Sequence, residues 1–233
     1  MKIMPMLLAG ALALTTGHLW AASGAEDSIE RLQLSSDTLQ AMINTPDKGI
    51  PEEVLNNAKC IVVVPHLVKG GFVIGGEHGR GVATCRTKAG WSSPAFVSIG
   101  GGSWGLQIGV EGVDLVMLVM NDHGLQHLLS SKFQVGADAS ASAGPIGRHA
   151  SAGTDWKMDS EILTYSRSKG VFAGISLDGA VVEQDEDSTR AIYGRGHSFH
   201  AVLSGEVPAP SSTLKFLKAI SEAAHTSAVA EAK

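Results

Sequence analysis

Residues 91–109 read WSSPAFVSIGGGSWGLQIG, an apolar, strand-like pattern that glycine interrupts repeatedly. Glycine weakens a strand unless a bend, a bulge or a closely approaching backbone or ligand needs the space. Apolar runs with glycines between them begin at Cys60 and continue to Met120. We therefore expect a sheet in which bends or close contacts call for glycine.

The apolar runs on both sides of this stretch predict several short strands. Pro65 is expected to end the first, and the runs cover residues 60–64, 72–74, 81–85, 95–99, 106–110 and 113–120. Short strands at this spacing favour an antiparallel sheet, a sandwich or a barrel. Asp178-Gly179, between the apolar residues 171–177 and 180–183, predicts a hairpin with a type I′ turn. Residues 136–153 are nearly all small, which suits a loop or a strand against which something bulky packs.

Helices are expected at both ends of this sheet region. Asp27, with Glu30 three residues later, fits a capping box, and Pro46 follows the end of the helix. Pro51 and Asn121 are expected to open two shorter helices. Ser211 or Ser212 is expected to cap a last helix whose inward residues are Leu214, Leu217 and Ile220.

The first 25 residues have the pattern of a secretory signal peptide. Lys2 precedes a short apolar segment, residues 6–14, and small residues follow at 21–25. The expected product is exported, periplasmic or extracellular, and soluble or peripheral on a membrane. We divide the rest into an N-terminal helical segment (26–57), a β-rich domain (58–205) and a C-terminal helix with its tail (206–233).

Charge and cysteine content narrow the classes of partner. The formal net charge is −5 and lysine and arginine form no cluster, which makes nucleic acid an improbable partner. Cys60 and Cys85 are the only cysteines. In an oxidising compartment they are expected to form a disulfide, which would stabilise the fold by about 3 kcal/mol.

Four motifs in order carry a resemblance to a known family. They lie at residues 91–109, 114–120, 136–148 and 165–174. Together they closely resemble the SYLF domain, a lipid-binding module of bacterial and eukaryotic proteins, over about residues 58–194. The resemblance implies an α+β fold, in which a glycine-rich antiparallel sheet curls toward a barrel and helices pack at the N- and C-terminal ends. It also implies a binding module rather than an enzyme, without a cofactor, whose partner is a phospholipid or a membrane surface.

Two sets of residues are candidates for lipid contact. One is the apolar face of the first helix, which could enter a lipid interface or equally cover the core of the sheet: Ile29, Leu32, Leu39 and Ile43. In eukaryotic SYLF proteins, the resemblance implies, such a helix and basic residues bind phosphoinositides. The other set is basic residues near glycine turns, of which each arginine could equally form a surface ion pair: Lys69, Arg80, Arg148, Arg167 and Lys169. Anionic lipid contributes only about 1 kcal/mol per basic residue.

Other functions fit the sequence less well. An envelope protein could use a free sheet edge or the small-residue segment to pair with a protein partner. Some eukaryotic members bundle actin, which an exported chain without an SH3 domain is not expected to meet. Ser103 lies in a G-x-S-x-G pattern, but strand-like residues follow it, whereas a hydrolase needs a helix there. His123 and His127 could share a metal, although a solvated helix face is the better interpretation, so no metal site is predicted.

Overall fold

The computed structural model describes residues 16–45, 49–146, 160–168, 171–172 and 177–225. Its helices are α1 (Thr16–Ile43), α2 (Glu52–Asn57), α3 (Asp122–Leu129), α5 (Glu186–Tyr193), α6 (Phe199–Leu203), η2 (Ser211–Thr213) and α7 (Leu214–His225). Its strands are β1 (Cys60–Thr87), β2 (Gly90–Trp91), β3 (Ala95–Val119), β4 (Lys132–Gln134), β5 (Ala141–Ala143), β6 (Ile162–Ser168), β7 (Val171–Phe172) and β8 (Val181–Gln184). The expected α+β class is confirmed.

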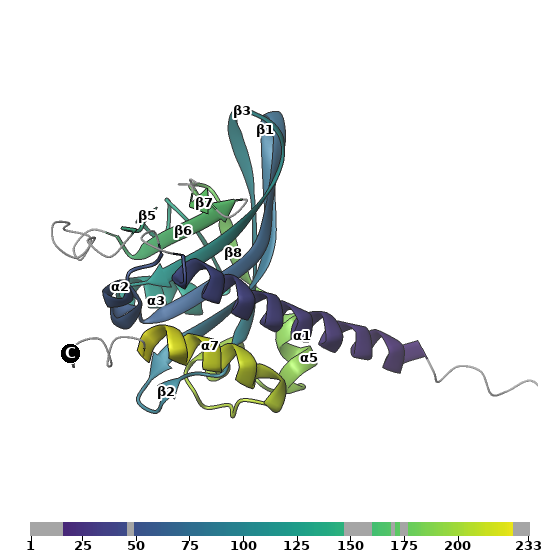
Figure 1. Ribbon diagram of the computed structural model, residues 1–233. Coiled ribbons are helices and arrows are strands. Elements are labelled where there is room, and N and C mark those ends of the chain that lie inside the picture. The colour runs from purple at the N-terminus through teal and green to yellow at the C-terminus, as the bar shows by residue number, and fades with distance from the viewer. Residues whose placement is uncertain (1–15, 46–48, 147–159, 169–170, 173–176, 226–233) are drawn as a thin grey trace, which may run out of the picture.

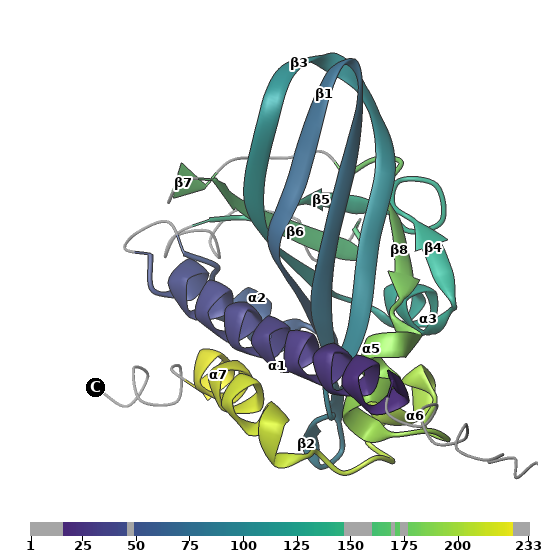
Figure 2. The same cartoon turned by 90° about the vertical axis from the view of Figure 1, so that its right-hand side faces the viewer.

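One eight-stranded sheet forms the centre of the molecule. Its main path runs β2-β1-β3-β6-β5, while β7 pairs with β6, and β8 pairs with both β3 and β4. All of these pairs are antiparallel except β5 with β6. The sheet curls, as the resemblance implied, and the helices lie around its lower part (Figures 1 and 2).

The two long strands β1 and β3 form a ribbon that bends back on itself. They pair from Cys60↔Val119 to Ala83↔Ala95, with two register shifts on the way. In Figure 2 the ribbon rises away from the helices, turns over and descends again. We call its projecting part, residues 67–80 of β1 with residues 98–113 of β3, the arch.

Two glycines allow the rising and descending limbs of β1 to lie against each other. A Cβ atom at Gly81 would come within 2.5 Å of the carbonyl oxygen of Val63, and one at Gly79 within 2.8 Å of the Leu67 side chain. Real Cβ atoms do not approach this closely, so a larger residue would force the limbs apart. The reason that the sequence analysis gave for glycines at residues 91–109, a closely approaching backbone, thus applies at Gly81 in β1.

The predicted strands are correct in type but wrong in number. The runs expected at residues 60–64, 72–74 and 81–85 all belong to β1, and those at 95–99, 106–110 and 113–120 fall in β3 or at its end. Pro65 does not end the first strand, because a bulge between Val64 and Leu67 takes up the missing N–H group. His66 in this bulge has a positive φ of 54°.

The predicted hairpin at Asp178-Gly179 is wrong in its pairing. A tight turn is present, since the Ala180 N–H donates to the Leu177 carbonyl at 2.8 Å and Gly179 has a φ of 90°. A type I′ turn would need a positive φ at Asp178 as well. After the turn β8 pairs with β3 and β4, while the described residues of β7 pair with β6.

A hydrophobic core lies on each face of the sheet. One lies among the sheet, α3 and α6, and includes Phe133, Phe199 and Leu203. The other lies under α1 and α7, which run side by side across the outer face in Figure 2. Its largest buried side chains include Phe96, Tyr165 and Phe216. The sheet is therefore covered on both faces near its base, and the arch extends beyond the helices.

The helix predictions fail mainly at the N-terminus. α1 begins at Thr16, so Asp27 lies within the helix and does not cap it. The first turn of α2 does follow Pro51, and the Asn121 side chain caps α3 by accepting from the Gly124 N–H at 2.9 Å. In α7 the expected inward residue Leu214 is exposed, and Phe216 fills the core instead. Among the described residues, no helix is long and apolar enough to cross a membrane.

Candidate functional site

The base of the arch is closed by a disulfide. Cys60, the first residue of β1, and Cys85, near its end, are bonded to each other, as the sequence predicted. Both are buried in the core on the inner face of the sheet. The bond therefore links the two ends of β1 at the base of the arch.

Inside the arch a lysine and a glutamate link the two limbs. Lys69 Nζ lies 2.8 Å from Glu77 Oε2, and the exposed fractions of the two side chains are 14% and 4%. The ion pair lies one step further along the arch than the contact between Leu67 and Gly79. Lys69, a predicted lipid contact, is thus held by a carboxylate between the limbs.

The outer surface of the arch carries two exposed valines. Val68 on β1 is 46% exposed and Val110 on β3 is 81% exposed. Val68 pairs with Gly112 and Val110 pairs with Gly70, so the two valines are diagonal neighbours on one face of the ribbon. The sequence analysis missed both residues.

Arg80 is the last β1 residue of the arch and lies close to a buried ion pair. Its side chain is 53% exposed, and its Nε lies 3.9 Å from Asp185 Oδ2. The same carboxylate binds buried Arg31 at 2.9 Å and accepts from the Ser188 hydroxyl at 2.8 Å. Arg31 also lies over the ring of Phe96. Arg80 therefore faces a carboxylate that is already paired.

The environment of this pair shifts the pKa values of both partners. Burial lowers the pKa of Arg31, and its contact with Asp185 opposes that effect. For Asp185, burial raises the pKa, but the hydrogen bonds from Ser188 and the contact with Arg31 outweigh it. The pKa of Asp185 therefore lies below its ordinary value, and the carboxylate stays ionised.

The remaining predicted basic residues fall into two groups. Arg167 on β6 forms an ion pair with Asp114 on β3, with Nη2 and Oδ2 3.1 Å apart. Arg148 and Lys169 lie outside the described residues. Every predicted basic residue that the structure describes is therefore close to a carboxylate, an alternative that the sequence left open for the arginines.

The apolar face of α1 faces the protein. Leu32 and Leu39 are buried in the outer core, and Ile43 packs against that core. Ile29 is half-buried. Insertion of Leu32 and Leu39 into lipid is thus at odds with this structure, because both side chains already fill the space between α1 and the sheet.

The serine motif is not built as a hydrolase site. Ser103 lies within β3, where its backbone pairs with Gly75 across the ribbon. A nucleophile elbow needs a sharp turn from strand to helix, and β3 continues as a strand to Val119. A cavity of about 360 Å³ lies elsewhere, beside α5 and α6, with Arg190, His197 and Phe199 among its lining residues.

A comparison with family models identifies the family. The model of the Ysc84 family, described as "Las17-binding protein actin regulator", matches residues 100–223. The chain belongs to this family, the SYLF family. The matched residues include part of the β3 side of the arch and continue to α7.

Similar proteins occur in animals and fungi. The chain is 31% identical over 170 residues to SH3 domain-containing YSC84-like protein 1 of Rattus norvegicus, covering 72% of this chain and 50% of that protein. It is 32% identical over 176 residues to Protein YSC84 of Saccharomyces cerevisiae (74% and 37% covered). It is 35% identical over 167 residues to SH3 domain-containing protein PJ696.02 of Schizosaccharomyces pombe (70% and 39% covered). The chain spans about half or less of the length of these SYLF relatives.

Proposed function

We propose that this SYLF protein is a lipid-binding module that associates with a membrane surface through the arch. The observation that carries the proposal is the exposure of Val68 and Val110, which are diagonal neighbours on one face of the arch. Exposed apolar side chains on the ribbon of the arch can enter the lipid interface without unfolding the protein. Membership of the SYLF family, whose members bind lipids, supports the same function.

The charges around the arch favour apolar rather than electrostatic binding. Lys69 and Arg167 are paired with carboxylates, and Arg80 faces one that is already paired. An anionic lipid would have to compete with these carboxylates for each cation. The proposed contact with lipid is therefore dominated by the arch, and a phosphoinositide preference is not part of the proposal.

The proposed location is outside the cytosol, on the periplasmic or extracellular side of a membrane. The pattern of residues 1–25 supports export, and the buried disulfide between Cys60 and Cys85 supports an oxidising compartment. The lipid would then be a phospholipid of the cell envelope.

A second candidate function is protein interaction. The family is described as binding Las17 and regulating actin, which concerns its named members. In this chain the small-residue strand β5 lies at one end of the main path of the sheet, and among the described residues it pairs only with β6. An edge strand of this kind can pair with a strand of a partner protein.

Sedimentation with liposomes separates these possibilities. The full chain is mixed with neutral and with anionic liposomes at low and at 0.5 M salt, together with the variant Arg80→Gln. We expect the wild type to sediment with both kinds of liposome, to keep most of its binding at about 0.5 M salt, and to match Arg80→Gln, because screening affects only exposed charges.

Two results would change the assignment. If binding needs anionic lipid, disappears with salt and weakens in Arg80→Gln, the membrane contact would be a basic surface instead of the arch. A chain that stays in solution with every liposome but is retained by an immobilised envelope protein would favour the protein-interaction module.

A further inference from the structure

The helix α3 places two histidines side by side near the sheet. His123 and His127 are four residues apart, so both rings lie on one face of the helix, and their centroids are 4.6 Å apart. The Asn121 cap and the C-terminal contacts of Ser130 fix both ends of this short helix. The pair is thus held by well-defined local structure.

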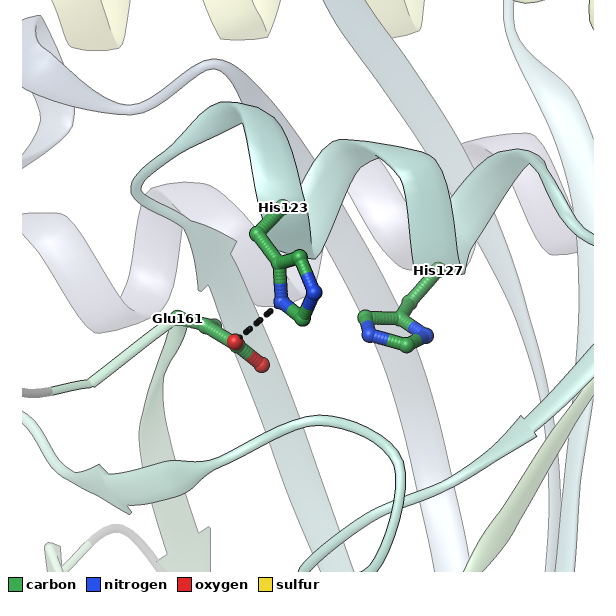
Figure 3. Close-up of side chains that lie close together, drawn as sticks. All are labelled: His123, His127 and Glu161. Atoms are coloured by element: carbon green, nitrogen blue, oxygen red, sulfur yellow. Dashed lines mark hydrogen bonds and ion pairs between the residues drawn. The ribbon is translucent and has the colours of Figure 1, made fainter.

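A glutamate distant in the sequence faces the two rings. Glu161 precedes β6 and lies 38 positions from His123, yet its Oε1 is hydrogen-bonded to His123 Nδ1. Figure 3 shows the carboxylate and the two rings turned toward one another. One ligand atom from each of the three residues lies within 4.8 Å of the others.

The glutamate is held in place by contacts outside the cluster. Its backbone carbonyl accepts from the Met120 N–H at 2.8 Å, next to the start of α3. Its Oε2 accepts from the Ser140 N–H at 2.9 Å, and its own N–H donates to the Ser140 hydroxyl at 3.1 Å. Such outer contacts orient a carboxylate and are typical of those that support metal ligands.

A second observation points to a missing partner. The Nε2 atom of His127 is shielded from solvent and has no hydrogen-bond partner among the described residues. Buried polar atoms are almost always satisfied, and one that is not calls for an ion, a water or a ligand. A cation between the two rings and the carboxylate would supply that partner.

We infer that His123, His127 and Glu161 form a binding site for a divalent transition-metal ion of the zinc class. Two imidazoles and a carboxylate are a common ligand set for zinc, whereas magnesium and calcium prefer oxygen ligands alone. Ligands about 2.1 Å from a tetrahedral zinc ion lie about 3.4 Å apart. In the structure the three ligand atoms lie within 4.8 Å of one another. Rotation of the His123 side chain, which is 63% exposed, can bring them to the distances that zinc requires.

The ion would join α3 to the start of β6 and leave its fourth position for water or an external ligand. The site is separate from the arch, so it does not depend on lipid binding. Sequence spacing pointed to a solvated helix face, because Glu161 cannot be recognised as a neighbour of the histidines without the fold.

Zinc binding to the metal-free full chain, with any affinity tag removed, tests the site. Titration calorimetry compares the wild type with His123→Ala and Glu161→Gln, and His200→Ala serves as the control because that exposed histidine lies on α6. We expect one zinc ion per wild-type chain, unchanged binding in His200→Ala and at least tenfold weaker binding in the two site variants. Cobalt added in place of zinc should give the visible absorption of a tetrahedral site only in the wild type and the control.

Thermal unfolding gives a second measurement that does not depend on calorimetry. Excess zinc should raise the melting temperature of the wild type and of His200→Ala, but not that of His123→Ala, because only a folded site binds the ion. Circular dichroism verifies that each variant is folded. Absence of zinc binding in the wild type, or equal binding in the wild type and the folded site variants, would overturn the inference.

Discussion

At the scale of single residues, the buried pair of Arg31 and Asp185 connects α1 to the N-terminus of α5. Both side chains are less than a tenth exposed, and Ser188 completes the hydrogen bonding of the carboxylate. Removing one partner of a buried ion pair leaves an uncompensated charge, which typically costs about 3 kcal/mol or more. The pair therefore makes the attachment of α1 sensitive to a single substitution and to acid.

Replacing Asp185 by Asn should destabilise the protein at neutral pH by about 3 kcal/mol. The pKa of Asp185 in the folded protein lies below its ordinary value. Its stabilising contribution is therefore complete above about pH 4 and is lost as the pH falls through the lower, folded pKa. Urea unfolding between pH 7 and pH 2 should show the difference between wild type and variant shrinking in acid.

Asp187→Asn is the matched control, because its carboxylate is 92% exposed and lies two residues away. It should change the free energy of unfolding little at any of these pH values. A difference between wild type and Asp185→Asn that stays constant down to pH 2 would contradict the role given to the ionised carboxylate.

At the scale of elements, local signals were predictable and long-range ones were not. Pro51 and Asn121 mark helix starts through contacts within a few residues, and the sequence reveals both. The continuity of β1 depends on contacts between its limbs, such as Gly81 against Val63, which no local pattern encodes. The start of α1 was wrongly predicted, because the residues that fit a capping box, Asp27 and Glu30, lie inside a longer helix.

The residues of the candidate sites show the same difference between local signals, which the sequence reveals, and long-range contacts, which it does not. The bond between Cys60 and Cys85 was predictable because the chain has only these two cysteines. The ion pairs of Lys69 and Arg167 depend on residues that the fold brings close, and so does the approach of Glu161 to His123. Val68 and Val110 could have been noticed only by following which residues alternate outward along two strands whose pairing was still unknown.

The disulfide should stabilise the arch as an element. The cysteines are 25 residues apart, and closing a loop of this length stabilises a protein by about 3 kcal/mol. The double variant Cys60→Ala/Cys85→Ala should lose about this much in urea unfolding and should no longer respond to reductant. The intact mass of the wild type should rise by two hydrogens on reduction, and equal masses would contradict the bond.

At the scale of the whole molecule, the fold separates a covered base from a projecting end. The two cores, the disulfide and the buried pair of Arg31 and Asp185 all lie toward the base, where α1 and α7 cover the sheet. The arch projects from this base as a narrow ribbon linked internally by Lys69 and Glu77. This arrangement leaves the arch accessible to a membrane surface, while the contacts at the base stabilise the fold.

The most direct test of the proposed lipid contact is liposome sedimentation of the full chain carrying Val68→Asp and Val110→Asp. Leu214→Asp is the control, because that exposed leucine begins α7, away from the arch. Residues 1–25 are common to every variant, so differences among them report on the substituted surface. We expect the double variant to lose at least tenfold in binding while Leu214→Asp matches the wild type. Equal sedimentation of all three proteins would contradict the assignment of the arch as the membrane contact.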